Sequence, residues 1–186
     1  MQPSSMKFEG HTTKGLAVGL RPPIPSDLPA LWAYINKLSK EQTFLLFQGE
    51  EISYEDETVW LDTQLDRIAR KQSVMLLALH FEELIGCAGI DMLDGVKRHT
   101  GGFGISVAQE YRGRGVGELL MQRVIEEAFA ELEGLEIITL EVFGNNPVGM
   151  NLYKKLGFTE FGRLPSGIIH RQDQVDAVYM YRHRNL

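Results

Sequence analysis

Hydrophobic positions recur with two different periods along the chain, and these periods predict an α/β fold. Short apolar runs and alternating apolar residues are typical of strands, whereas apolar residues three or four positions apart are typical of helices. The strand patterns cover residues 16–20, 73–81, 84–93, 101–107, 137–143, 158–170 and 174–181. The helix patterns cover residues 28–38, 57–71, 116–132 and 146–156. The apolar positions of the second helix include Val59, Trp60, Leu65 and Ile68.

The order of these elements is β-α-α-β-β-β-α-β-α-β-β. It predicts a single α/β domain with a mixed sheet of about seven strands and about four helices. Turn signals between the early strands favour an antiparallel first half. The strands at 101–107 and 137–143 are separated by a helix and are expected to be parallel. We expect the domain to span 15–186, because the polar segment 1–14 is typical of a loose tail.

Composition and charge narrow the class of protein. The chain has 186 residues, of which 44% are hydrophobic and 24% charged, as in a soluble globular domain. The formal net charge of −6 argues against nonspecific binding to nucleic acid. Cys87 is the only cysteine, which favours a reducing compartment and leaves no thiolate cluster for a metal. Without a signal peptide or an apolar span for a membrane, the chain is expected in the cytoplasm.

A glycine-rich turn follows the strand at 101–107 and precedes a helix. It comprises Arg112, Gly113, Arg114, Gly115, Val116 and Gly117. Glycines let the backbone approach a ligand closely, and the first N–H groups of a helix have no partner within the helix. The helix dipole and the two arginines add positive charge, so this turn is suited to an anion such as a pyrophosphate.

Two common phosphate-binding patterns do not fit this turn. The chain has no Gly-Lys dipeptide, which the Walker A loop needs. Glu118 stands where the third glycine of a dinucleotide-binding fingerprint would be, and the turn comes after several strands that are expected to be antiparallel. A nucleotide-binding α/β domain is therefore disfavoured.

The segment from Leu140 to Phe158 carries a second motif. Local rules explain Asn146 as a helix N-cap, Pro147 at the first helical position and Gly157 at the left-handed end. These rules do not require Tyr153. The segment resembles the pattern N-x-x-A-x-x-L-Y-x-x-x-G-F of the GNAT N-acetyltransferase superfamily. It matches at Asn146, Leu152, Tyr153, Gly157 and Phe158, and Gly149 replaces the usual alanine.

The glycine turn is similar to the coenzyme A loop R-x-x-G-x-G/A of the same superfamily, through Arg112, Gly115 and Gly117. The resemblance implies that acetyl-coenzyme A lies where the strands 101–107 and 137–143 splay apart. The cofactor-binding residues that it implies are Ile105, Val107, Arg112, Gly113, Arg114, Gly115, Val116, Gly117, Asn146 and Tyr153. It also implies that an amine attacks the thioester directly, with Tyr153 protonating the departing thiolate. No metal is expected.

The general base and the acceptor site are less defined. Many relatives carry a carboxylate on the strand before the glycine loop, but residues 102–107 contain none. Glu141 is the base that we select, and Asp91 and His170 are further candidates. The missing carboxylate favours an amine of low pKa or a base that acts through water.

The resemblance places the acceptor site between residues 40–56 and 162–174. Glu50, Glu51 and His170 are the expected substrate-binding residues, and Phe44 and Phe47 would either line a pocket or fill the core. The predicted function is transfer of an acetyl group to a small amine, an amino acid or a protein N-terminus. The alternative is a non-catalytic coenzyme A-binding sensor or interaction module. The acceptor amine, the length of the acyl chain and homodimerisation stay open.

Overall fold

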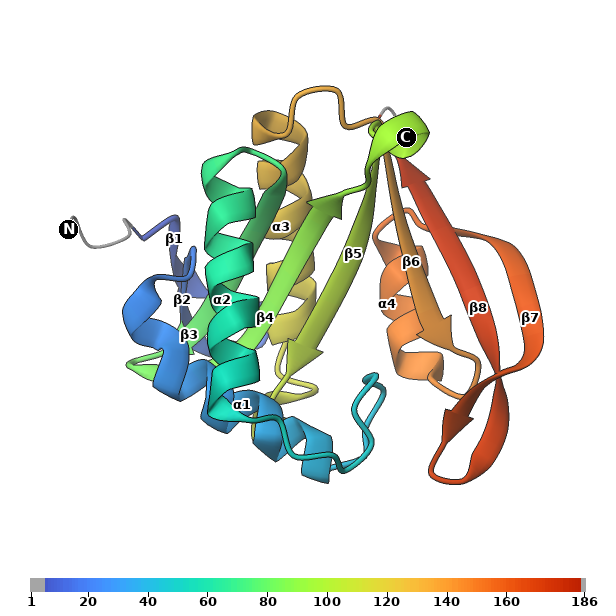
Figure 1. Ribbon diagram of the computed structural model, residues 1–186, viewed down its shortest axis with the longest axis horizontal. Helices are drawn as coiled ribbons and strands as arrows, with labels where there is room; N and C mark the ends of the chain where they lie inside the picture. Colours follow the sequence, from blue (N-terminus) through green and yellow to red (C-terminus); the bar gives the residue numbers. More distant parts are fainter. Residues whose placement is uncertain (1–5, 185–186) are drawn as a thin grey trace.

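The hydrophobic strands form one mixed sheet in the computed structural model, which describes residues 6–184 (Figure 1). The strand order is β1-β2-β3-β4-β5-β6-β8-β7. The strands are β1 (Phe8–His11), β2 (Ala17–Arg21), β3 (Ser73–His80), β4 (Glu83–Met92), β5 (Thr100–Val107), β6 (Ile137–Phe143), β7 (Thr159–His170) and β8 (Asp173–His183). The α-helices are α1 (Leu28–Lys40), α2 (Tyr54–Ala69), α3 (Val116–Glu131) and α4 (Pro147–Lys155). Short 3₁₀ helices are η1 (Pro25–Asp27), η2 (Gly95–Lys97) and η3 (Gln109–Tyr111).

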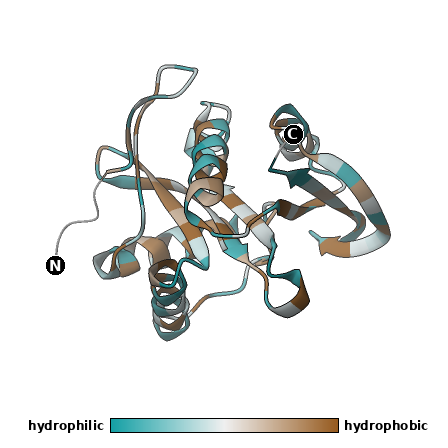
Figure 2. Ribbon diagram, turned by 90° about the horizontal axis from the view of Figure 1, so that it is seen from above, coloured by the Kyte–Doolittle hydropathy of each residue, from teal (hydrophilic) through white to brown (hydrophobic). Residues whose placement is uncertain are grey.

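Helices cover both faces of the sheet, so the core has two parts (Figure 2). The larger cluster joins the buried face of α3 and Tyr153 of α4 to the face of β3 to β6 that these two helices cover. A smaller cluster joins Leu31 and Leu38 of α1 and Leu61 of α2 to the opposite side of β3 and β4. Each helix buries one apolar stripe, as its periodicity predicts.

Only one pair of neighbouring strands is parallel, and it is short. β5 and β6 pair from Thr100 with Ile137 to Gly102 with Thr139, and beyond these residues the two strands diverge. Figure 1 shows the gap as a V that opens toward the lower edge of the molecule, with α4 behind it. The other adjacent strands are antiparallel. The predicted α/β class, the antiparallel first half and the splayed parallel pair are confirmed.

The sheet has eight strands rather than seven, because Phe8–His11 pairs with β2. This strand lies within the segment expected to be a loose tail, so that expectation is wrong for residues 8–11. Residues 1–5 lie outside the described part of the chain. An alternation of half-buried and exposed residues over only four positions was too short a signal for a strand.

The second helix begins earlier than predicted, and only Leu65 and Ile68 of its predicted apolar positions pack against the core. It starts at Tyr54, and Ser53 caps it by accepting a hydrogen bond from the Asp56 N–H at 3.0 Å. Val59 and Trp60 are exposed, at 62% and 38%. The buried positions are Glu57 and Leu61. A carboxylate therefore occupies a core-facing position of an amphipathic helix.

Candidate active site

The edge of β5 beside the V-shaped gap presents backbone N–H groups without a strand partner. The Ala108 N–H donates to the Ile85 carbonyl at 2.9 Å, which fixes the alternation of hydrogen bonds between β4 and β5. By that alternation, the N–H groups of Ile105 and Val107 point away from β4 and into the gap. They lie beyond Gly102, where pairing with β6 ends. These amides can donate to a carbonyl oxygen or an amide held in the gap.

The glycine loop, residues 112–117, leads from β5 into the N-terminus of α3. Gly113 and Gly115 have φ values of +71° and +84°, in the left-handed region that favours glycine. Within residues 6–184, the N–H groups of Gly117 and Glu118 donate no hydrogen bond to a protein acceptor. The start of α3 thus has the free amides and the dipole end that suit a pyrophosphate.

The N-terminal segment supports the glycine loop from outside. The Thr12 hydroxyl donates to the Arg114 carbonyl at 2.7 Å, and the Lys14 ammonium donates to the Gly113 carbonyl at 2.7 Å. A Cβ atom at Gly115 would lie 3.0 Å from the Cβ of Thr12. Glycine is therefore required at 115 by the loop's own packing as well as by any ligand. No pattern in the sequence predicts this contact, because Thr12 and Arg114 are 102 residues apart along the chain.

The two arginines of the glycine loop differ in their contacts. Arg112 Nε donates to the Val107 carbonyl at 2.9 Å, and its guanidinium also pairs with the Glu41 carboxylate at the end of α1. Arg114 lies over the Tyr111 ring, 5.7 Å from the centroid. Arg112 therefore ties the loop to β5 and α1, whereas Arg114 is the loop cation that stays at the surface.

Tyr153 lies on the face of α4 that packs against the sheet. Its ring is 9% exposed and contacts Phe103 of β5 and Phe158, with centroid separations of 6.2 and 6.3 Å. Burial raises the pKa of Tyr153 to about 12. Its hydroxyl makes no hydrogen bond with any described residue, and it is not among the fully enclosed polar atoms. A hydroxyl that only completes the core would have a backbone partner, so this one is free to bind a ligand.

Asn146 caps α4, as the sequence predicts. Its Oδ1 accepts a hydrogen bond from the Gly149 N–H at 2.9 Å. A Cβ atom at Gly149 would lie 2.6 Å from Asn146 Nδ2, so the glycine makes room for this position of the cap. The departure from the usual alanine therefore has a local structural cause.

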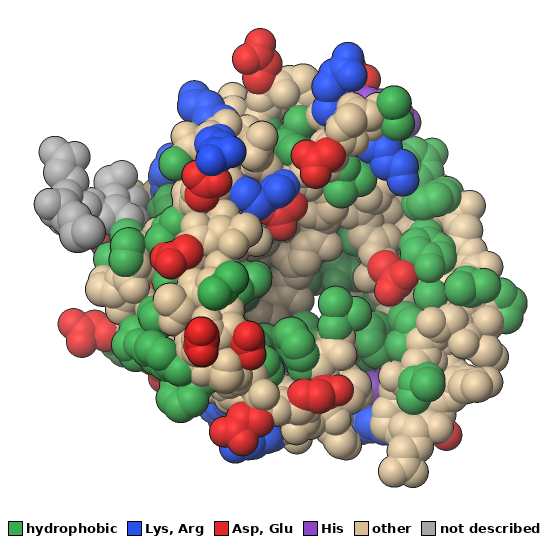
Figure 3. Space-filling view, viewed as in Figure 1, with side chains coloured by type: hydrophobic (Ala, Val, Ile, Leu, Met, Phe, Trp, Pro, Cys, Tyr) green, Lys and Arg blue, Asp and Glu red, His purple; other side chains and the backbone are tan. Residues whose placement is uncertain are grey.

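A second hollow lies on the other face of the sheet, beneath α1, the start of α2 and the loop between them. This acceptor cavity has a volume of about 710 Å³. It is lined by Leu31, Tyr34, Ile35, Leu46, Phe47, Glu50, Glu51, Ile52, Asp56, Glu57, Trp60, Cys87 and Ser106. Figure 3 shows a hollow in the middle of this face, with acidic side chains gathered along its lower rim. A smaller hollow of about 220 Å³ shares Trp60, Cys87 and Ser106 with it.

The structure brings two of the three expected substrate-binding residues into this cavity, Glu50 and Glu51. Phe47 lines the cavity as well. Phe44 instead packs edge-on against Phe143 at the end of β6, with ring centroids 5.8 Å apart. Phe47 therefore takes the pocket-lining role considered from the sequence, whereas Phe44 is 37% exposed and belongs to neither core cluster.

His170, the third expected substrate-binding residue, is buried, and both of its ring nitrogens are engaged. Nδ1 is 3.0 Å from the Asn145 side-chain nitrogen, and Nε2 is 3.1 Å from the Gln42 carbonyl. Arg171 Nε donates to the same carbonyl at 2.9 Å. The contacts with Gln42 fasten the β7–β8 hairpin to the loop after α1, and the contact with Asn145 joins it to the turn between β6 and α4. They give His170 a positioning role and leave neither nitrogen available to take a proton from an amine.

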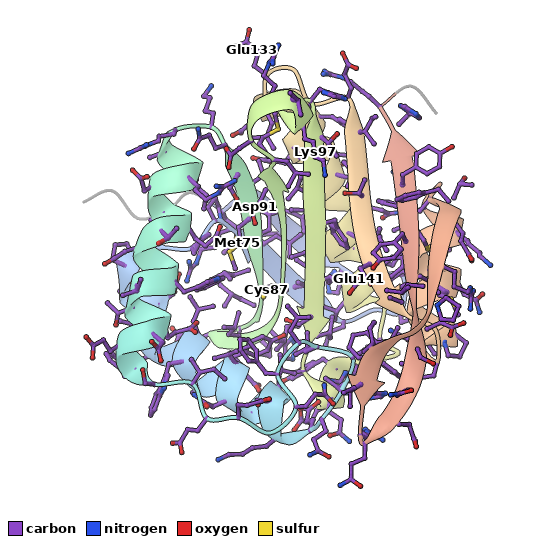
Figure 4. All side chains as sticks on the ribbon, turned by 45° about the vertical axis from the view of Figure 1, so that its right-hand side comes forward. Met75, Cys87, Asp91, Lys97, Glu133 and Glu141 are labelled. Carbon is purple, nitrogen blue, oxygen red and sulfur yellow. The ribbon has the colours of Figure 1, made fainter. Side chains whose placement is uncertain are left out.

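Neither of the two carboxylates that were considered as bases lines the acceptor cavity, although Asp91 lines the smaller hollow that shares Trp60, Cys87 and Ser106 with it. Glu141 is exposed on β6 and lines a separate hollow of about 470 Å³, which shares no lining residue with the acceptor cavity. A hydrogen bond with Glu141 raises the pKa of Tyr179 on β8. Asp91 accepts from Arg67 Nε at 3.3 Å. Figure 4 shows Asp91 and Cys87 on β4 and Glu141 on β6, on the other side of β5.

The sequence reasoning assigned no role in the acceptor site to Tyr34, Ser106 or Glu57, which carry polar groups into the cavity. Tyr34 and Ser106 share a hydrogen bond of 3.0 Å between hydroxyls, and Ser106 Oγ is 3.3 Å from the Cys87 thiol. Glu57 completes the group. A signal for Glu57 existed, because it lies four residues before Leu61, on the buried stripe of α2. Tyr34 likewise lies on the buried stripe of α1, between Leu31 and Leu38.

Comparison with known proteins agrees with this geometry. A family model described as Acetyltransferase (GNAT) family matches residues 32–158. The L-amino acid N-acetyltransferase AaaT of Escherichia coli is 31% identical over 133 residues, which cover 71% of this chain and 80% of that protein.

Solved structures have the same fold. An acetyltransferase of the GNAT family from Streptococcus pneumoniae superposes with a TM-score of 0.80 and 26% identity, covering 89% of this chain and 98% of that one. A phosphinothricin acetyltransferase from Sinorhizobium meliloti, in complex with acetyl-coenzyme A, has a TM-score of 0.78 at 18% identity and covers 89% and 88% of the two chains. The family model and the relative in Escherichia coli together show that this chain belongs to the GNAT acetyltransferase family and is an acyltransferase.

Proposed function

We propose that the protein transfers an acetyl group from acetyl-coenzyme A to a primary amine by direct attack. The observation that carries this proposal is the opening of the sheet between β5 and β6. It leaves the N–H groups of Ile105 and Val107 unpaired, in a gap that α4 and the partly exposed Tyr153 hydroxyl border. The acceptor cavity lies on the opposite face of β5, so donor and acceptor can meet at one strand.

The residues present fit acetyl-coenzyme A as the donor. The free amides at the start of α3 suit its pyrophosphate, with Arg114 as a nearby cation. Gly117 contributes no side chain where α3 approaches Leu152 and Val107, whose nearest atoms are 3.6 and 3.8 Å from its ideal Cβ position. The acetyltransferase of Sinorhizobium meliloti, which shares this fold, binds the same compound. When bound, this donor supplies the acetyl group as an activated thioester.

The chain's own groups account for the transfer. The N–H groups of Ile105 and Val107 stabilise negative charge that develops on the carbonyl oxygen. The nitrogen of the incoming amine forms the new C–N bond as the C–S bond breaks. The Tyr153 hydroxyl gives its proton to the departing sulfur, and the surplus proton on nitrogen restores the hydroxyl. Burial raises the pKa of Tyr153, and it also raises the pKa of a thiol in the same cleft. The pKa values of the phenol and of the thiol therefore stay comparable.

The remaining residues have supporting roles in this proposal. Arg112 and Gly113 hold the glycine loop in shape, whereas Val116 begins α3 and Asn146 keeps α4 beside the gap. Because of its separate hollow and its hydrogen bond with Tyr179, Glu141 is not retained as the base.

The test is an amine-panel acetylation assay. The purified protein is incubated with acetyl-coenzyme A and primary amines, and both free thiol and acetylated product are measured. A thermal shift with coenzyme A, NAD and ATP identifies the ligand of the glycine loop. Stabilisation by coenzyme A together with transfer to an amine supports the proposal. Binding without transfer to any amine would establish the non-catalytic alternative, and stabilisation only by NAD or ATP would overturn the donor assignment.

Some expectations stay predictions. No helix of residues 6–184 is both long and apolar enough to cross a membrane. Location in the cytoplasm and a homodimer are further predictions. Gel filtration would test the homodimer, and localisation of a tagged fusion protein would test the location in the cytoplasm.

A further inference from the structure

Glu57 is a mostly buried residue whose carboxylate has no partner among residues 6–184 and is not fully enclosed by protein atoms. It is 6% exposed and lines the acceptor cavity. Its side chain makes no hydrogen bond or ion pair within the part of the chain that the structure describes. The neighbouring acids differ, because Asp56 accepts from the Ser53 hydroxyl at 2.7 Å and Glu50 accepts from the Gln48 N–H. A buried polar group of this kind needs a partner, and here the cavity is where one can bind.

The groups around Glu57 belong to the wall that faces the transfer site. Ser106 precedes Val107, whose N–H points into the gap, and it bonds to Tyr34 and Cys87. Burial raises the pKa of the Cys87 thiol, and the charge of Glu57 adds to this, which places the carboxylate near β4. Burial also raises the pKa of Glu57 itself. Of the β5 residues, only Ser106 lines this cavity and only Gly104, Ile105 and Ser106 line the smaller hollow beside it, so β5 brings no carboxylate to either.

The cavity combines apolar walls with negative charge. Aromatic and aliphatic side chains line it, and its charged groups are Glu50, Glu51, Asp56 and Glu57. No cationic side chain from residues 6–184 lines it. An ammonium group is attracted to such a cavity, whereas a carboxylate that enters it meets only like charge.

We propose that Glu57 binds the acceptor's ammonium group and takes its proton, and that the acceptor is a primary amine with an apolar body and no carboxylate beside the nitrogen. This inference rests on the proposed acetyl transfer. The proposed acceptor class excludes free amino acids, because their carboxylate has no cation to bind in this cavity. A hydrocarbon amine and an amino acid amide both satisfy the requirement.

The proton balance of the reaction closes with this assignment. The ammonium group gives one proton to the Glu57 carboxylate and becomes a neutral amine. Its lone pair forms the C–N bond as the C–S bond breaks. The nitrogen then loses a second proton, which replaces the one that Tyr153 gives to the sulfur. The products are an amide, a thiol and one proton, which Glu57 releases to water.

The first experiment removes the charge of Glu57 and keeps its shape. Glu57→Gln should lower kcat/KM for phenethylamine about 100-fold or more, since a general base typically contributes about 100-fold to 10,000-fold. The dissociation constant of acetyl-coenzyme A should stay within about twofold. Glu55→Gln is the matched control, because Glu55 is an exposed acid on the same helix that does not line the cavity. Glu57→Asp, which restores a carboxylate, should recover part of the activity.

The second experiment varies the charge of the acceptor. Phenethylamine, phenylalaninamide and phenylalanine share an aromatic body and differ beside the nitrogen. The first two should exceed phenylalanine in kcat/KM by about 100-fold, as expected for like charges in a partly desolvated site. In Glu57→Gln this ratio should shrink about tenfold, because one repelling charge is gone. A merely structural role of Glu57 would leave the ratio unchanged.

The outcomes separate this inference from the proposed function. If the wild-type protein transfers acetyl groups but accepts phenylalanine as well as its amide, the substrate class is wrong while the transferase activity stands. If Glu57→Gln is folded by thermal melting and as active as the wild type, Glu57 is not the base. If the wild type acetylates none of the amines, the proposed function itself fails.

Discussion

The donor cleft and the acceptor cavity lie on opposite faces of the same strand, yet they are built from different parts of the chain. The donor cleft consists of the β5–β6 gap, the glycine loop and α4, and backbone N–H groups and Tyr153 supply its binding groups. The acceptor cavity is built from side chains of α1, α2, the loop between them and two strands.

The difference has a physical consequence. Backbone amides are common to every sequence, so a donor cleft built from them depends on glycines and a helix start at fixed spacing. A cavity built from side chains can change its charge and shape with single substitutions. In the proposed reaction, the donor cleft therefore binds the acetyl donor that is the same for every acceptor, and the acceptor cavity selects the amine.

The largest expected effect is at Tyr153, where the two sides meet. Tyr153→Phe should lower kcat about 100-fold, because it removes the proton donor. The dissociation constant of acetyl-coenzyme A and the melting temperature should barely change, because the hydroxyl has no protein partner to lose. Steady-state kinetics and calorimetry measure both. Equal turnover in the variant would remove Tyr153 from the mechanism.

His170 tests the acceptor side. His170→Ala removes one hydrogen bond to the loop after α1 and one to the turn between β6 and α4, and should cost roughly 1–3 kcal/mol of unfolding free energy. KM for the amine should rise, while the affinity for acetyl-coenzyme A should hold. Denaturant unfolding and binding assays measure these changes. His183→Ala is the control, since His183 is exposed on β8. A loss of affinity for acetyl-coenzyme A without a rise in KM for the amine would contradict the separation of the donor cleft from the acceptor cavity.

Gly115 tests the donor side. Gly115→Ala should cost about 1–2 kcal/mol, because alanine is strained at a φ of +84° and its Cβ would crowd Thr12. Affinity for acetyl-coenzyme A should fall with it. Gly117→Ala is the matched control, because its Cβ would make only ordinary contacts, at 3.6 Å or more. Thermal melting and titration calorimetry follow both variants. Similar behaviour of the two would show that the left-handed turn is not what shapes the loop.

The smallest effect is expected at Gly149. Gly149→Ala should displace the Asn146 cap, which costs about 1 kcal/mol. The better helix propensity of alanine returns a similar amount, so the net change in stability should be under about 0.5 kcal/mol. Asn146→Ala, without that compensation, should lose about 1 kcal/mol. Thermal melting separates the two variants. A large loss of stability in Gly149→Ala would contradict the expectation that helix propensity offsets the loss of the cap.

The sequence predicted the donor cleft better than the acceptor cavity. The glycine loop and Tyr153 follow from residues close together along the chain, and the structure places both beside the gap. Glu50 and Glu51 were also predicted to face the acceptor, and they line its cavity. Glu57 was missed because the first turns of its helix were assigned the wrong face: Val59 and Trp60 looked like core residues but are exposed, whereas Leu65 and Ile68 do pack against the core.

By itself, the sequence determined the order of strands and helices, the left-handed glycines and the free helix start, because each depends on residues a few positions apart. Only the tertiary structure decided that Thr12 supports Gly115, that His170 joins the hairpin to the loop, and that an unpartnered Glu57 lies near Cys87. These relations join residues that are distant along the chain. They arise from packing, which no local pattern encodes.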